Sequence, residues 1–208
     1  MAILFTIVEV MENLYKLAKT ALNEHQVIAF PTETVFGLGV YYDDEQAYQL
    51  LNKVKRRRED KPYTLMLYDV DQIEKYAFID EKVKNALKRF MPGPLTLLLR
   101  SKDNVPNYVT HNTGIIGVRI TENKEALDLL KYLEKPLLVP SANRADQKPA
   151  MNSDEVKEIF QDEIKVIIPG KAIGGLPSTI IDLTGNEIKL IRQGPITLED
   201  IKKALLKC

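Results

Sequence analysis

Short aliphatic and β-branched runs alternate with longer amphipathic segments along this chain of 208 residues, but not in a strict strand–helix–strand order. Apolar residues recur three or four positions apart, which predicts helices, in residues 10–25, 45–57, 81–90, 124–133, 153–160 and 198–206. The intervening runs predict strands at 3–8, 27–30, 63–67, 96–100, 115–120, 136–139, 165–168, 179–183 and 188–192, with a hairpin over 182–192. The pattern predicts an α/β protein of the α+β kind, in which helices flank a twisted, mixed β-sheet.

The sequence shows no internal repeat, linker or abrupt change in composition, so we expect residues 1–208 to form a single domain. Lys and Arg total 29, as do Asp and Glu, and a net charge of zero means that any anion site must be local. The one cysteine, Cys208, excludes an intrachain disulfide and a thiolate metal cluster. A signal peptide pattern and a long apolar run are both missing from the sequence, which predicts a cytoplasmic protein that does not enter a membrane.

Six cations lie among the nine residues 53–61, at the end of an expected helix. Positive charge suits the carboxyl end of a helix, so a solvated last turn is one interpretation. The run leads straight into an expected strand, however, and Lys55, Arg57 and Lys61 could instead surround a polyphosphate. The run by itself leaves both interpretations open.

Arg119 and Arg192 each interrupt an otherwise aliphatic run. A buried arginine needs a partner, which could be a carboxylate of the same chain or a bound ligand. Two such strands in one chain favour a shared anion pocket.

Hydroxyl and amide side chains gather where expected strands begin or end: Thr32 and Thr34 in the segment 31–39, Ser141 with Asn143, and Ser178. Each fits ordinary turn chemistry, and 31–39 is expected to connect a strand to a helix. Together with the cations, and without an obvious proton-shuttling histidine, they suit a nucleoside triphosphate site that works by positioning and charge neutralisation. The phosphate-loop and dinucleotide fingerprints are both missing, so a less common nucleotide fold is required.

The segments 31–39, 55–61, 92–96, 117–119, 140–143, 178–182 and 191–194 occur in the order found in the YrdC-like family, which the chain therefore resembles. The resemblance includes a Lys-x-Arg pair, Lys55 and Arg57, and a Ser-x-Asn pair, Ser141 and Asn143. It implies a YrdC-like fold around a basic concave pocket, in the short form with no additional C-terminal domain. The chain departs from the usual family pattern at Phe36, Arg58 and residues 144–147.

This resemblance implies an L-threonylcarbamoyladenylate synthase, a nucleotidyltransferase that condenses L-threonine, bicarbonate or CO2, and ATP into threonylcarbamoyl-AMP with release of pyrophosphate. Other proteins would then transfer the threonylcarbamoyl group to an adenosine beside the tRNA anticodon. Mg2+ is expected to come with ATP, held by phosphate oxygens and water rather than by protein ligands. Direct binding of tRNA or other RNA would be weak at most.

The resemblance also implies roles for individual residues. The catalytic set is Lys55, Arg57, Ser141 and Asn143. The ATP site comprises Lys55, Arg57, Lys61, Ser141, Asn143 and Arg192, and the L-threonine site comprises Thr32, Thr34, Arg119 and Ser178. We expect Lys55 and Arg57 to lie near the surface, where their replacement would leave stability unchanged.

Two alternatives remain. One is a YrdC-like paralogue with another activity, although the intact Ser141 and Asn143 pair argues against it. The other is a module that binds double-stranded RNA or tRNA by shape and phosphate contacts. The zero net charge and the few aromatic residues near 53–61 argue against such a module.

Overall fold

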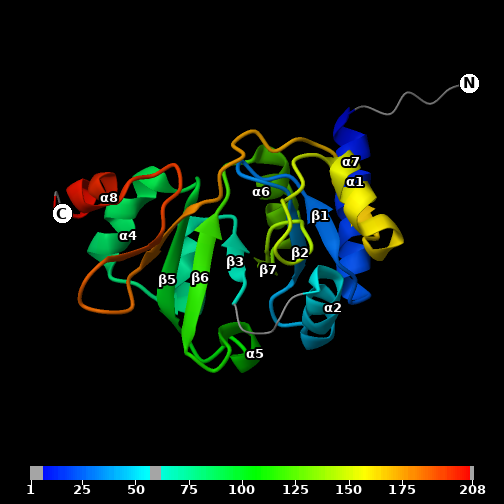
Figure 1. The fold of residues 1–208 in the computed structure, drawn as a ribbon. Helices are drawn as coiled ribbons and strands as arrows, with labels where there is room; N and C mark the ends of the chain where they lie inside the picture. The colour runs from blue at the N-terminus through cyan, green and yellow to red at the C-terminus, as the bar shows by residue number, and fades with distance from the viewer. Residues whose placement is uncertain (1–6, 57–61, 207–208) are drawn as a thin grey trace, which may run out of the picture.

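The computed structural model describes residues 7–56 and 62–206. Its strands form one mixed ten-stranded sheet in the order β10-β9-β5-β6-β3-β7-β2-β1-β8, with β4 paired to β5 (Figure 1). The strands are β1 Ile28–Phe30, β2 Gly37–Tyr41, β3 Thr64–Leu67, β4 Ala77–Phe78, β5 Leu95–Ser101, β6 Ile115–Ile120, β7 Leu137–Leu138, β8 Val166–Ile167, β9 Thr179–Asp182 and β10 Lys189–Arg192. The predicted fold class, a mixed sheet with flanking helices in one domain, is confirmed.

Eight α-helices pack on this sheet in the described part of the chain: α1 Ile7–Asn23, α2 Glu45–Lys55, α3 Ile73–Tyr76, α4 Glu81–Leu87, α5 Asn107–Thr110, α6 Lys124–Leu133, α7 Ser153–Phe160 and α8 Leu198–Leu205. Short 3-10 turns lie at Val70–Gln72, Lys88–Phe90 and Gln161–Glu163. Figure 1 shows α4 and α8 together at the β5 end, and α1, α2 and α7 gathered at the end that holds β1 and β2.

The core lies on both faces of the sheet because successive side chains of a strand point to opposite faces. Along β3, Leu65 and Leu67 belong to one buried apolar cluster, while Met66 between them belongs to the other. Helices α2 and α6 begin after side chains that accept hydrogen bonds from first-turn N–H groups, Asp44 before α2 and Asn123 before α6. Local capping and strand alternation thus agree with the tertiary arrangement.

Two predictions of local structure are wrong. The strand expected at residues 3–8 falls partly outside the described residues, and its last two positions, 7 and 8, begin α1 instead. The segment 31–39 leads into β2, which pairs antiparallel with β1, and not into a helix. The predicted hairpin near residue 185 is confirmed, since β9 and β10 pair antiparallel.

The connection from β8 to β9 runs across the molecule, from the side of α1 and α7 to the side of β5 and β6 (Figure 1). Midway, the N–H groups of Gly174 and Gly175 donate to the carbonyl oxygens of Glu33 and Thr34, both at 2.9 Å. The connection is therefore attached by its backbone to the loop that follows β1, and it brings residues 174–178 beside residues 33–34.

Gly194 closes a tight backbone contact just after β10. The hydroxyl oxygen of Thr179 accepts from the N–H groups of Gly194 and Ile196, at 3.0 and 3.1 Å, and donates to the carbonyl of Ile196 at 2.6 Å. A Cβ at Gly194 would lie 2.3 Å from the Thr179 nitrogen and 2.5 Å from the Pro177 oxygen. Only glycine permits this approach without moving backbone.

We expect Gly194→Ala to lower the free energy of unfolding by about 1–3 kcal/mol, because the added methyl must displace β9 or break the bonds to Thr179. Urea unfolding measures the change. The matched control is Gly185→Ala, where a Cβ would meet no atom within 4 Å. The control should be unchanged or slightly more stable, and equal stability of the two variants would contradict this account of the contact.

Candidate functional site

A cleft of about 520 Å3 opens where several strands end, and its lining comes from six segments of the chain. They are the loop after β1, the start of β3, β6, the loop after β7, the approach to β9, and β10. The volume falls in the range of cofactor and small-molecule sites. None of the residues that line it in the described part of the chain is Asp or Glu.

The cleft brings together five of the predicted site residues, which the sequence places up to 158 positions apart: Thr34, Arg119, Ser141, Ser178 and Arg192. Thr32 lies directly behind, with its hydroxyl 3.0 Å from that of Thr34. Lys55 and Asn143 are both hydrogen-bonded to Ser141. Arg57 and Lys61 lie outside the described residues.

Arg119 is held by an internal carboxylate. Its Nη2 atom donates to Glu33 Oε1 at 2.6 Å and to Thr34 Oγ1 at 2.9 Å, and the other carboxylate oxygen accepts from Thr121 at 2.5 Å. The Arg119 and Glu33 side chains are only 9% and 10% exposed. The Nε atom of Arg119 is nevertheless buried without a hydrogen-bond partner in the described structure. The guanidinium is thus paired on one nitrogen and retains an unused donor beside the cleft.

Glu33 and Thr121 were missed by the sequence analysis. The need of Arg119 for a carboxylate partner was foreseen, but the sequence does not identify which of 29 acidic residues supplies it. The partner is 86 positions away. A usable signal was the placement of Glu33 between two threonines already singled out.

Arg192 has no carboxylate partner among the described residues. Its Nε donates to the carbonyl oxygen of Ser178 and its Nη2 to the Ser178 hydroxyl, both at 3.0 Å. The Ser178 hydroxyl also lies 2.8 Å from that of Thr96. Partial burial lowers the pKa of the Arg192 guanidinium, and the nearby charge of Arg119 lowers it further. The two arginines repel each other across a cleft whose described lining residues include no carboxylate, so an anion bound there would be stabilised by both.

Lys55 does not lie on the surface, and that expectation is wrong. Lys55 is 2% exposed, and its ammonium donates to the carbonyl oxygens of Ser141 and Asn143 at 2.5 and 2.9 Å, and to Asn143 Oδ1 at 3.2 Å. The Ser141 hydroxyl donates to the same Oδ1 at 2.6 Å. The Lys-x-Arg and Ser-x-Asn pairs are therefore in direct contact through Lys55, which supports the loop after β7 from within.

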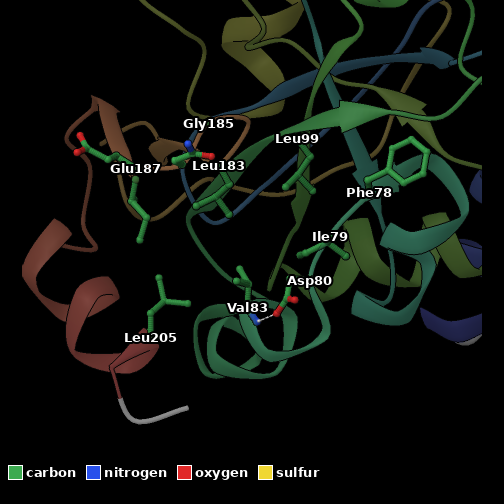
Figure 2. A pocket seen from close by; sticks show the side chains of 11 residues that line it. Phe78, Ile79, Asp80, Val83, Leu99, Leu183, Gly185, Glu187 and Leu205 are labelled. Atoms are coloured by element: carbon green, nitrogen blue, oxygen red, sulfur yellow. Dashed lines mark hydrogen bonds between the residues drawn. The ribbon is translucent and has the colours of Figure 1, made fainter.

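A second cavity, of about 200 Å3, lies between β5, the β9–β10 turn, α4 and α8 (Figure 2). Its walls are mainly apolar, with Leu99, Leu183 and Leu205 among them, and its charged residues are Asp80 and Glu187. The Asp80 carboxylate accepts from the N–H of Val83 at the start of α4. This cavity offers no cation for an anionic ligand and holds none of the predicted site residues that the structure describes.

Within residues 7–56 and 62–206, the structure contains no group of three or more His, Cys, Asp or Glu side chains that could hold a metal ion. No helix in the same part of the chain is long and apolar enough to cross a membrane.

Comparisons with known proteins agree with this fold. The model of the Sua5_yciO_yrdC family, described as "Telomere recombination", matches residues 20–194. A threonylcarbamoyl-AMP synthase of Pyrococcus abyssi is 36% identical over 192 residues, which are 91% of this chain and 56% of that protein. A threonylcarbamoyl-AMP synthase of Escherichia coli O6:H1 is 35% identical over 178 residues, 83% of this chain and 92% of that protein.

The crystal structure of Pyrococcus abyssi Sua5 complexed with L-threonine superposes with a TM-score of 0.88 at 35% sequence identity, covering 93% of this chain and 57% of that one. The chain thus spans little more than half of the length of the Pyrococcus proteins, and most of the length of the Escherichia coli protein. The family match and these identities lead to one conclusion: the chain belongs to the Sua5, YciO and YrdC family.

Proposed function

We propose that the protein is an L-threonylcarbamoyladenylate synthase, which condenses L-threonine, bicarbonate or CO2, and ATP into threonylcarbamoyl-AMP and pyrophosphate. The observation that carries the proposal is the cleft in which Arg119, with a buried unpaired donor, faces Arg192, and in which none of the described lining residues is acidic. The ATP phosphates and the threonine carboxylate are the anionic groups that such a cleft would bind. The names of the relatives support the synthase over the two alternatives. Because the chain spans 56% of the Pyrococcus relative, the proposal concerns the part that the two share.

In the proposed reaction the threonine amine attacks the carbon of CO2, and its proton leaves as the N–C bond forms; when bicarbonate is the source of that carbon, a C–O bond also breaks and water is released. A carbamate oxygen then attacks the α-phosphorus of ATP, and the bond from that phosphorus to the bridging oxygen breaks to release pyrophosphate. The carbamate is already an oxyanion, so the step needs alignment and cations more than a side-chain base. That requirement fits a cleft whose charged lining residues are arginines.

The roles divide between two ligand groups. Arg119 would bind the threonine carboxylate, since its guanidinium already stands against Thr34 and keeps a free donor. Thr32, Thr34 and Ser178 would supply hydroxyls to threonine or its carbamate. Arg192, Ser141 and Asn143, together with Arg57 and Lys61, would hold ATP and its phosphates. Lys55 would act mainly by supporting residues 141 and 143, because its ammonium already bonds to them.

Mg2+ is proposed to arrive with ATP. The carboxylate next to the cleft, Glu33, has both oxygens engaged, by Arg119 and by Thr121. Phosphate oxygens and water would therefore be its ligands, and the ion would neutralise phosphate charge when bound. The product would pass to proteins that modify tRNA, which makes the cytoplasm the expected compartment.

The first test is the reaction itself. The isolated protein should release pyrophosphate from ATP only when threonine and bicarbonate are both present, and tRNA should not accelerate it. Serine, which lacks one methyl, should be used about fivefold less well, and valine at least a hundredfold less well because it leaves buried polar groups unpaired. Product mass spectrometry and a pyrophosphate assay measure this. An absolute need for tRNA, with RNA binding that falls steeply with salt, would favour the RNA-binding module instead.

Arg192→Gln should raise the KM for ATP by about tenfold to a hundredfold, the loss expected for a charge-assisted contact to phosphate. The fold should be unaffected because no described carboxylate depends on Arg192. Arg100→Gln is the matched control: Arg100 also donates its Nε to a backbone carbonyl, that of Thr184 at 3.2 Å, but it lies outside the cleft. Similar kinetics for the two variants would remove Arg192 from the site.

Lys55→Met should lower both activity and stability. Methionine fills a similar volume but removes the ammonium donor from the carbonyl oxygens of Ser141 and Asn143, at a cost of about 1–3 kcal/mol, although the Ser141 oxygen keeps the N–H of Asn143 at 3.0 Å. Thermal unfolding and the pyrophosphate assay, run on the same preparation, separate the two effects. Full stability with lost activity would show instead that Lys55 acts on the ligand alone.

A further inference from the structure

Arg144 follows the Ser-x-Asn pair and has an unusual number of partners. Its side chain is 12% exposed and pairs with the Glu163 carboxylate. One terminal nitrogen donates to the carbonyl of Val54, the other to the carbonyl of Ile159 at 3.1 Å. The guanidinium also lies 4.8 Å from the ring centroid of Phe160, which is buried. The side chain thus joins the loop after β7 to α2 and to the end of α7.

The contact with α2 supplies hydrogen-bond donors to carbonyl groups at the end of this helix. The last four carbonyl groups of an α-helix lack partners within the helix. At the end of α2, the carbonyl of Val54 accepts from the Arg144 side chain, and that of Lys55 accepts from the N–H of Ala145 at 2.8 Å. A cation near the carboxyl end of a helix is also favoured by the helix dipole. Residues 144 and 145 therefore cap α2 from outside.

Lys55 also joins α2 to the loop after β7, but here the donor lies on the helix and the acceptors lie on the loop. Its ammonium donates from α2 to the carbonyl oxygens of Ser141 and Asn143. The Asn143 amide nitrogen, in turn, donates to the carbonyls of Arg144 and Gln147, both at 2.8 Å, which orients its oxygen toward Lys55 and the Ser141 hydroxyl. The placement of Ser141 and Asn143 therefore depends on where residues 144–147 are fixed.

We propose that Arg144 is a positioning residue for the ATP site: by fixing the loop after β7 to α2 and α7, it sets the placement of the Ser141 and Asn143 side chains. Arg144 is absent from the cleft lining, so its effect on the ligand would pass through these two residues. A lysine cannot replace it, because a single ammonium nitrogen cannot reproduce two separate terminal donors, one to Val54 and one to Ile159, in a planar group that also lies over the Phe160 ring. This inference rests on the proposed function for the identity of the ligand.

The test compares Arg144→Lys and Arg144→Ala with wild type in the intact protein. Four quantities are measured: the Kd for ATP by calorimetry without threonine, the KM for ATP, the KM for threonine, and the Tm. Both variants should bind ATP at least tenfold more weakly, with less than a threefold change in the KM for threonine. Guanidinium ion at low millimolar concentration should restore part of the ATP binding of Arg144→Ala, and methylammonium should not.

Two controls separate positioning from general destabilisation. Glu163→Gln keeps an acceptor for Arg144 at a half-exposed position, and its ATP affinity should change less than threefold. Lys84→Gln removes a buried cation that pairs with carboxylates at α4, away from the cleft, and should lower the Tm without selective loss of ATP binding. The proposal is overturned if Arg144→Lys binds ATP as tightly as wild type does. It is also overturned if the apparent affinities for ATP and for threonine fall together in proportion to the loss of Tm, as expected for general destabilisation.

Calorimetry also keeps this test apart from the proposed function. If wild type binds ATP but releases no pyrophosphate with threonine and bicarbonate, the proposed reaction fails while the role of Arg144 is still decided by the ATP affinities. If wild type does not bind ATP, both proposals are wrong.

Discussion

The buried pair of Arg119 and Glu33 is the constraint on which the cleft depends. A guanidinium in a strand inside a sheet cannot remain without a counter-charge, because burying an unpaired charge costs several kcal/mol. Glu33 supplies it from the loop after β1, and Thr121 engages the remaining oxygen. This network fixes the loop against β6. The same loop then offers its backbone carbonyls to the connection between β8 and β9.

The positive cleft follows from incomplete neutralisation. Glu33 engages one terminal nitrogen of Arg119, and the Nε donor remains unpaired. Among the described residues, the side-chain hydrogen bonds of Arg192 go to a carbonyl and a hydroxyl of Ser178. Burial, and to a smaller extent the nearby charge of Arg119, lower the pKa of the Arg192 guanidinium. Repulsion between two such cations is typical of a site that binds an anion, because the bound anion reduces this repulsion.

The fold class and most strands and helices could be predicted from the sequence because aliphatic and helical periodicities are local. The strand β6, Ile115–Ile120, lies where its aliphatic run predicts it. Strand β2, Gly37–Tyr41, was not expected because glycines at alternate positions carry little strand propensity, yet neighbouring β1 and β7 pair with it. The helix at the N-terminus begins within a run of β-branched residues, where tertiary context overrides propensity.

The site was predicted as a set of residues but not as a set of contacts. Chemistry-bearing side chains are visible as interruptions of apolar runs, and five of them line the cleft. Partners distant in sequence are not visible: the bond from Lys55 to Ser141 spans 86 positions. The basic run 53–61 therefore suggested that Lys55 is exposed, whereas in the structure it is buried. The assignment of residues to ATP or threonine remains a prediction, as do the roles of Arg57 and Lys61.

The order of strands has a consequence for the growing chain on a ribosome. One edge of β5 is covered by β4 over Arg100 and Ser101 and by β9 over residues 95–98. The latter stretch is largely aliphatic, and its partner is made more than 80 residues later. Until Thr179–Asp182 leaves the ribosome, this edge has open N–H and carbonyl groups that could pair with another chain. The edge of β5 therefore lacks its β9 partner throughout the synthesis of the residues between them, and the cleft is completed only after that partner arrives.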